Sequence, residues 1–147
     1  MKIFNRKKPK EIVVYFGVPG SGKTTLAALH ARKALKRGET VYSNVPIIGT
    51  RQYIPYKDFG VHMMEDCLIL LDEASLEFNN RDYGKFPKTA REFFKLHRHY
   101  GATVEVYSQS YEDMDITIRR LATKYVLVKK SLIPFFITTR TATAIID

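Results

Sequence analysis

The sequence has few of the features that mark secreted and membrane-spanning proteins. Its one cysteine, Cys67, permits no internal disulfide and suits a reducing compartment. Because Cys67 leads into the apolar run at 68–71, we expect a small buried residue and not a reactive thiol. No apolar run approaches the roughly 18 residues that a membrane-spanning helix needs, and the N-terminus lacks the apolar segment of a secretory signal. These absences predict a cytoplasmic chain.

Internal repeats and low-complexity tracts are also absent, and acidic residues are few. Lys and Arg number 24 against 15 Asp and Glu, so the formal net charge is +9. Five of the cations lie in the first ten residues, with no acid among them. We expect 1–10 to be a basic arm and 11–147 to be one domain. The arm is either a solvated segment or a contact for nucleic acid or a membrane surface, and charge alone does not decide between them.

Strand-like and helix-like segments alternate along the domain. Short apolar runs predict strands at 12–16, 40–43, 67–71, 103–107 and 123–128, with a weaker strand at 52–54 and a strand or hairpin within 133–145. Helical periodicity predicts helices at 22–36, 88–100 and 114–121. The buried face of the first is expected to be formed by Leu26, Leu29, His30, Ala34 and Leu35. This alternation predicts an α/β fold in three layers, with a mostly parallel sheet covered on both faces.

A phosphate-binding loop connects the first strand to the first helix. The residues expected to contact the nucleotide are Gly17, Val18, Pro19, Gly20, Ser21, Gly22, Lys23, Thr24 and Thr25. Glycines let the backbone N–H groups turn towards phosphate oxygens, and the helix N-terminus adds a positive dipole end. Lys23 would reach the β- and γ-phosphates, and the hydroxyl of Thr24 would bind Mg²⁺. We therefore expect ATP and Mg²⁺ to be bound here.

Two acidic residues directly follow the most apolar strand. Asp72 is placed to organise Mg²⁺, because a carboxylate at the end of a neighbouring parallel strand would face the phosphate loop. Glu73 is a candidate general base that activates the attacking water. The alternative for both residues is that they are acidic side chains in the first turn of a helix, where negative charge is favourable. The Asp-Glu pair favours hydrolysis over phosphoryl transfer to a small-molecule hydroxyl.

Further site residues are expected from the strand at 103–107, which should lie between the strands of the phosphate loop and of Asp72. Gln109 follows it and is a candidate to contact the γ-phosphate or the water, the alternative being an ordinary loop residue. A neighbouring subunit often supplies an arginine to such sites. Arg119 and Arg120 are the leading candidates, with Arg98 and Arg81 as others, and the alternative for each is a surface salt bridge. The cations of 88–100 form one stripe, which is either a solvated face, a track for a phosphate backbone or a subunit interface.

Several segments together resemble the N-terminal ATPase domain of the zonular occludens toxin-like family, the assembly and export proteins of filamentous bacteriophages. Besides the phosphate loop, they are Tyr42-Ser43-Asn44-Val45-Pro46, Leu70-Leu71-Asp72-Glu73-Ala74, His97-Arg98-His99-Tyr100-Gly101, Ser108-Gln109 and Ile116-x-Ile118-Arg119-x-Leu121. The resemblance spans about 15–140. The phosphate loop is common to many families, whereas the Ser-Asn-Val-Pro and His-Arg-His-Tyr-Gly segments are more specific.

The resemblance implies a RecA-like core that assembles into homo-oligomers, with Asp72, Glu73 and Gln109 in the roles above. It also implies single-stranded phage DNA and phage coat or assembly proteins as partners, at the cytoplasmic face of the bacterial inner membrane. Family members commonly continue into a transmembrane helix and a periplasmic domain, which are not in this sequence. The toxin activity in the family's name belongs to another region and is not implied here.

Other functions remain open at this point. A DNA-packaging or conjugation-type translocase would share the same site. A small-molecule kinase would use the phosphate loop but has less need of Glu73. A nucleotide-gated binding module would bind ATP without turnover.

Overall fold

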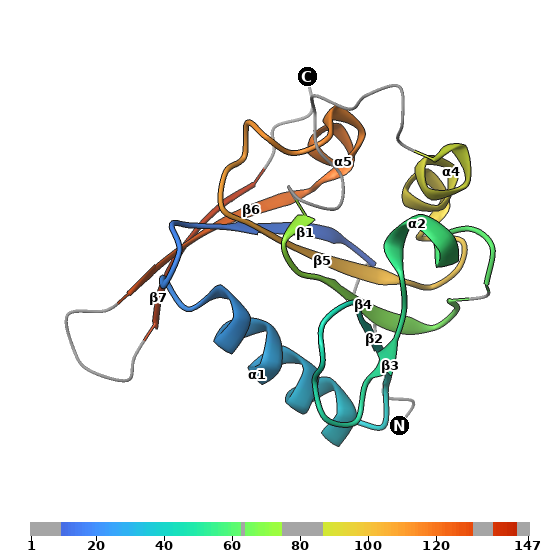
Figure 1. Cartoon of the computed structure of the whole chain (residues 1–147), viewed down its shortest axis with the longest axis horizontal. Coiled ribbons are helices and arrows are strands. Elements are labelled where there is room, and N and C mark those ends of the chain that lie inside the picture. The colour runs from blue at the N-terminus through green and yellow to red at the C-terminus, as the bar shows by residue number, and fades with distance from the viewer. Residues whose placement is uncertain (1–9, 63, 75–86, 131–136, 144–147) are drawn as a thin grey trace, which may run out of the picture.

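The computed structural model describes residues 10–62, 64–74, 87–130 and 137–143, in which a seven-stranded sheet forms the centre of the fold (Figure 1). The strands are β1 Ile12–Phe16, β2 Thr40–Ser43, β3 Arg51–Gln52, β4 Cys67–Leu71, β5 Thr103–Ser108, β6 Lys124–Lys130 and β7 Ile137–Thr143. Their order is β3-β2-β4-β5-β1-β6-β7. All neighbouring pairs are parallel except β6 and β7, which run antiparallel.

Helices cover both faces of this sheet. Helix α1, Lys23–Lys36, lies on one face, and α4, Lys88–Leu96, and α5, Ile116–Leu121, lie on the other (Figure 1). A short helix α2, Pro55–Asp58, packs beside α4. The predicted three-layer α/β fold, with its mostly parallel sheet and added C-terminal strand, is therefore confirmed. In the described part of the chain, no helix is both long and apolar enough to cross a membrane.

The burial of β4 explains why its sequence has no polar alternation. All five of its side chains are buried, because α1 covers one face of the strand and α4 the other. Cys67 is 4% exposed, and burial raises the pKa of its thiol to about 12, which confirms the expected small buried residue. A parallel strand packed on both faces reads as a continuous apolar run.

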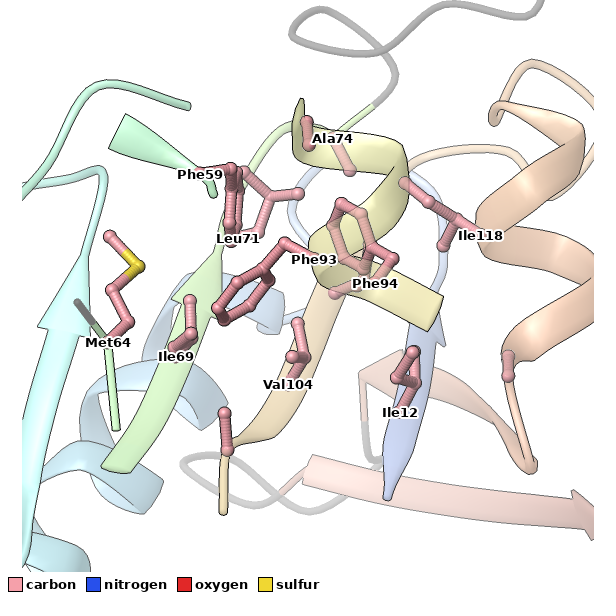
Figure 2. Close-up of a cluster of buried hydrophobic side chains, with 14 of the residues drawn as sticks. Ile12, Phe59, Met64, Ile69, Leu71, Ala74, Phe93, Phe94, Val104 and Ile118 are labelled. Carbon is pink, nitrogen blue, oxygen red and sulfur yellow. The ribbon is translucent and has the colours of Figure 1, made fainter. Parts of the chain in front are cut away.

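Two apolar clusters hold the layers together. On the face of α4 and α5, large side chains fill the space, with Phe59, Phe93 and Phe94 at its centre and Ile118 on the side of α5 (Figure 2). On the other face, α1 packs through Leu26 and the alanines Ala27, Ala31 and Ala34, with Leu35 partly buried beside them. Alanines bring this helix close to the sheet, so the two helical layers are built differently.

The layer between α1 and the sheet also contains a polar cluster. The hydroxyl of Tyr107 donates to Glu105 Oε2 at 2.6 Å, and Nδ1 of His30 lies 2.8 Å from the same oxygen. The ring of Tyr15 stacks on that of Tyr107 with centroids 4.8 Å apart. Burial, with the nearby Glu105 carboxylate, raises the pKa of Tyr107 far above its usual range. These contacts connect α1 to β5.

Some expected boundaries and one expected buried side chain are wrong. Leu29 is 44% exposed, because α1 rests on Leu26 and its alanines and turns Leu29 outward. Helix α4 ends at Leu96 and not at residue 100, since the next residues form a turn closed by Gly101, whose φ is +69°. Arg98 of the expected basic stripe therefore lies beyond the helix.

Smaller shifts occur elsewhere. Helix α5 begins at Ile116 and not at 114, because Asp115 caps it by accepting a hydrogen bond from the Thr117 N–H at 2.7 Å. The weak strand is at Arg51–Gln52, and α2 follows where only loop was expected. Strands β5 and β6 extend to Ser108 and Lys130. Residues 75–86, a polar stretch left without assignment, and the connection at 131–136 lie outside the described residues.

Candidate nucleotide-binding site

The loop between β1 and α1 has the backbone conformation that an anion site requires. Gly20 and Gly22 have φ of +78° and +102°, a region that other residues adopt only at a cost. Gly22 immediately precedes α1, and no side chain caps that helix end. The first turn of α1 contains no acidic residue. Its backbone N–H groups and dipole are therefore available to an anion such as phosphate.

Lys23 lies inside this loop. Its side chain is buried, and Nζ donates to the carbonyl oxygens of Gly17 at 2.6 Å and Val18 at 3.1 Å. The loop thus curls around its own cation. A cation so placed, beside unpaired N–H groups, makes the site electropositive at its centre.

Gly17 lies where the loop touches two strands. A Cβ atom on Gly17 would be 2.4 Å from the carbonyl oxygen of Val128 in β6, and its N–H donates to the carbonyl of Ser108 in β5 at 3.2 Å. Here glycine is required for space and not for a positive φ. The loop is therefore held against the carboxyl ends of both neighbouring strands.

A cavity of about 370 Å³ lies on the β6 side of the loop. Its lining consists of the loop at 17–21 and the end of β6 at 127–130. Lys129 and Lys130 are exposed at that end. This second wall could not be predicted from the sequence, because no local pattern connects β6 with the loop.

Asp72 meets the loop from the other side. It follows the last residue of β4, is 3% exposed, and its Oδ2 accepts a hydrogen bond from Thr24 Oγ1 at 3.0 Å. Sheet order explains the approach, because β5 lies between β4 and β1, as predicted, and the three strands end at one edge. The predicted metal-binding pair, Thr24 and Asp72, is thus brought together.

Glu73 directly follows in an uncommon conformation. Its φ is +53°, in the left-handed region, and its N–H donates to Asp72 Oδ1 at 2.9 Å. Its Oε2 is buried and has no hydrogen-bond partner among the described residues. A buried carboxylate oxygen of this kind can accept a proton.

The oxygen atoms of Thr24 and Asp72 suit Mg²⁺. This ion prefers hard oxygen ligands and is commonly bound by one or two protein groups together with substrate phosphates. A hydroxyl and a buried carboxylate, 3.0 Å apart beside the phosphate loop, provide such groups. The donor set fits the predicted metal.

The remaining predicted residues are less closely joined to this centre. Gln109 is exposed and follows β5 at the same edge of the sheet, and Thr25 is exposed in the first turn of α1. Arg119 is on α5, across the sheet from α1, with its guanidinium carbon 5.4 Å from the ring centre of Tyr111. Arg120 on α5 is exposed, and Arg81 lies outside the described residues. The roles of Gln109 and Arg119 stay predictions.

One residue that sequence reasoning named without a role contacts the site. Asn44 follows β2, and its side chain makes two hydrogen bonds to the backbone of Asp72. The only signal in the sequence was its place in the Ser-Asn-Val-Pro segment.

Comparisons with known proteins show the family of this chain and its fold. The family described as Zonular occludens toxin (Zot) matches residues 49–144, more than half of the chain. Among solved structures, the N-terminal domain of zonular occludens toxin from Neisseria meningitidis is similar, with a TM-score of 0.67 and 20% identity. That alignment covers 94% of this chain and 86% of the other.

A viral protein has the same fold. The genome packaging NTPase B204 from Sulfolobus turreted icosahedral virus 2, in complex with AMPPCP, aligns with a TM-score of 0.64 and 17% identity. The alignment covers 82% of this chain and 75% of that one. The same NTPase in complex with ATP-gammaS gives 0.63 and 13%, with coverage of 82% and 75%. A search of curated protein sequences finds no significant match.

Proposed function

We propose that this chain, which belongs to the zonular occludens toxin family, binds and hydrolyses Mg-ATP to power the export of single-stranded phage DNA during filamentous phage assembly. The observation that carries the proposal is the hydrogen bond between Thr24 and Asp72, which joins the phosphate loop to the carboxyl end of β4. It joins Thr24 to Asp72 at one point, and Lys23 and Glu73 are their neighbours in the chain. These residue types at one point suit nucleotide hydrolysis.

In the proposed reaction, Lys23 and the loop N–H groups hold the phosphates of ATP. Glu73 takes a proton from a water molecule as the water oxygen attacks the γ-phosphorus. The bond from that phosphorus to the bridging oxygen breaks, and ADP and inorganic phosphate leave. Mg²⁺, when bound by Thr24 and Asp72, neutralises negative charge on the phosphate oxygens.

Two substitutions test this assignment separately. Glu73→Gln should keep nucleotide affinity and lower turnover by about 10²–10⁴-fold, the usual contribution of a general base. Lys23→Ala should lose binding, because it removes the cation at the centre of the loop. Lys33→Ala, an exposed cation of α1, is the matched control and should behave as wild type. Fluorescent-nucleotide titration and phosphate release measure the two steps, and normal turnover by Glu73→Gln would remove Glu73 from this role.

We further propose that the protein works as a homo-oligomer at the cytoplasmic face of the inner membrane, with Arg119 completing a neighbour's site. Motors of this kind place a rigid cation against transition-state charge. The solution mass should rise when a slowly hydrolysed ATP analogue is added, and a strict monomer under saturation would contradict the proposal. Arg119→Ala should then lower turnover in the oligomer only.

DNA packaging or translocation without coat proteins is the second candidate. It is favoured by the likeness to the genome packaging NTPase B204, over 82% of this chain. Hydrolysis that is stimulated by DNA alone would support translocation. Stimulation that requires phage coat or assembly proteins would support export.

A further inference from the structure

Asn44 clamps the backbone of Asp72 with both ends of its side-chain amide. Its Nδ2 donates to the Asp72 carbonyl oxygen at 2.9 Å, and its Oδ1 accepts from the Asp72 N–H at 2.8 Å. A side-chain amide has the same donor and acceptor as a peptide group. Asn44 therefore takes the place of a backbone neighbour for Asp72.

Asp72 needs this neighbour because the sheet ends before it. The pairing of β4 with β2 ends at Leu70, and its pairing with β5 ends at Leu71. Asp72 itself is 3% exposed, so its backbone groups have little access to water. Leaving a buried polar group without a partner costs about 1–3 kcal/mol.

The clamp also fixes the peptide bond between Asp72 and Glu73. That peptide is planar, and its carbonyl oxygen is held by Asn44 while its N–H donates to Asp72 Oδ1 at 2.9 Å. Glu73 begins from this plane with its φ at +53°. The direction in which Glu73 leaves the sheet thus depends on a group that is bonded on both edges.

The segment around Asn44 is itself braced. Ser43 is buried, and its hydroxyl donates to the carbonyl oxygen of Val45 at 2.7 Å and accepts from the Val45 N–H at 3.2 Å. The side chain of Gln52 donates to the same carbonyl at 3.0 Å. Asn44 is therefore held on both sides by residues with fixed positions, so its amide is already oriented towards Asp72.

We propose that Asn44 is a positioning residue for hydrolysis, which aims the carboxylates of Asp72 and Glu73 by holding the peptide between them. The inference rests on the proposed function, since it presupposes that Glu73 activates water. Asn44 acts on the reaction through Asp72, whereas the phosphate loop makes the contacts with the nucleotide. Losing it should lower kcat and leave nucleotide affinity nearly unchanged.

The test compares Asn44→Ala and Asn44→Asp with wild type. Asn44→Ala removes both hydrogen bonds, whereas Asn44→Asp keeps the acceptor and places a carboxylate against the Asp72 carbonyl. Both should lower kcat by about 10–100-fold, the usual effect of removing a group that orients a metal-binding residue. Each kcat is normalised to the fraction of protein that binds a slowly hydrolysed ATP analogue, so that a loss of folded protein does not count. Dissociation constants for the analogue should stay within about 2–3-fold of wild type.

Thr50→Ala is the matched control, because it loses a side-chain hydrogen bond in the loop after Asn44, to the carbonyl oxygen of Ile47 at 2.7 Å, without touching residues 43–45 or Asp72. It should keep the wild-type kcat. A wild-type kcat in folded Asn44→Ala overturns the inference alone, and so does unfolding of both Asn44 variants, which would make Asn44 a residue of folding. Absence of turnover in the wild-type protein overturns the proposed function instead.

Discussion

Single atoms decide which residues the phosphate loop tolerates. Gly17 is the clearest case, since a Cβ there would be 2.4 Å from a backbone carbonyl and 2.8 Å from Ser21 Oγ. A backbone atom of β6 cannot turn away as a flexible side chain can. The loop must therefore move if Gly17 is replaced.

Gly17→Ala should lower the free energy of unfolding by about 1–3 kcal/mol, because overpacking displaces the loop from β6. Gly20→Ala is the comparison, with no atom within 4 Å of the added Cβ and only its φ of +78° to oppose it. That backbone strain costs about 1–2 kcal/mol. Urea unfolding measures both, and nucleotide affinity should fall further in Gly17→Ala. Wild-type affinity in that variant would contradict the close contact with Val128.

At this scale the sequence predicted which residues lie near the phosphate loop better than which long-range contacts they make. Lys23, Thr24, Asp72 and Glu73 were identified because their residue types and their places after strands follow from local pattern. Asn44 was not assigned a role, because its hydrogen bonds join it to a residue 28 positions away. The left-handed φ of Glu73 likewise has no signal in the local sequence.

Among the elements, α4 shows how one helix is anchored. Phe93 and Phe94 are buried against Phe59, with centroids 5.3 and 5.0 Å from its ring (Figure 2). Leu96, at the end of the same helix, is 42% exposed. The aromatic pair therefore determines where α4 sits on the sheet.

Phe94→Ala should lower the free energy of unfolding by about 3–5 kcal/mol, since it leaves a cavity among the aromatic rings. Leu96→Ala, on the same helix, should change it by less than about 0.5 kcal/mol. Urea unfolding monitored by circular dichroism gives both values. Equal effects of the two substitutions would show that α4 is not anchored through Phe94.

Element boundaries were predicted less well than elements. The periodicity of 88–100 continues past Leu96 in the sequence, but the left-handed turn at Gly101 ends the helix earlier. Leu29 has the spacing of a buried position, yet α1 packs through alanines and excludes it. Periodicity predicts that a helix has an apolar face. The packing of individual side chains against the sheet determines which residues lie at the centre of that face.

For the whole molecule, nucleotide binding should appear as added stability. A ligand at about 100 times its dissociation constant contributes about 2.7 kcal/mol to a folded state that alone binds it. For a domain of this size, that should raise Tm by about 5–10 °C. The shift should vanish in Lys23→Ala and persist in Lys33→Ala, as differential scanning fluorimetry with Mg-ATP can measure. An equal shift in Lys23→Ala would contradict binding at the phosphate loop.

The fold as a whole was predictable because short local patterns in the sequence mark each strand and helix in turn. Apolar runs that end in Gly17 or Asp72 give parallel strands whose carboxyl ends share an edge, and the position of β5 between β4 and β1 was expected. The antiparallel partner of β6 was expected only as a strand or hairpin. The sequence of β7 is rich in Thr, which is typical of a strand but does not indicate whether the strand runs parallel or antiparallel to β6.

The polar cluster beneath α1 has a mechanical consequence. An apolar interface permits a helix to slide, whereas the bonds from His30 and Tyr107 to Glu105 are directional and break on sliding. Helix α1 begins with Lys23 and Thr24, and β5 leads to Gln109. These two parts of the site should therefore move as one rigid body. Any movement that accompanies nucleotide turnover would therefore have to arise outside that body.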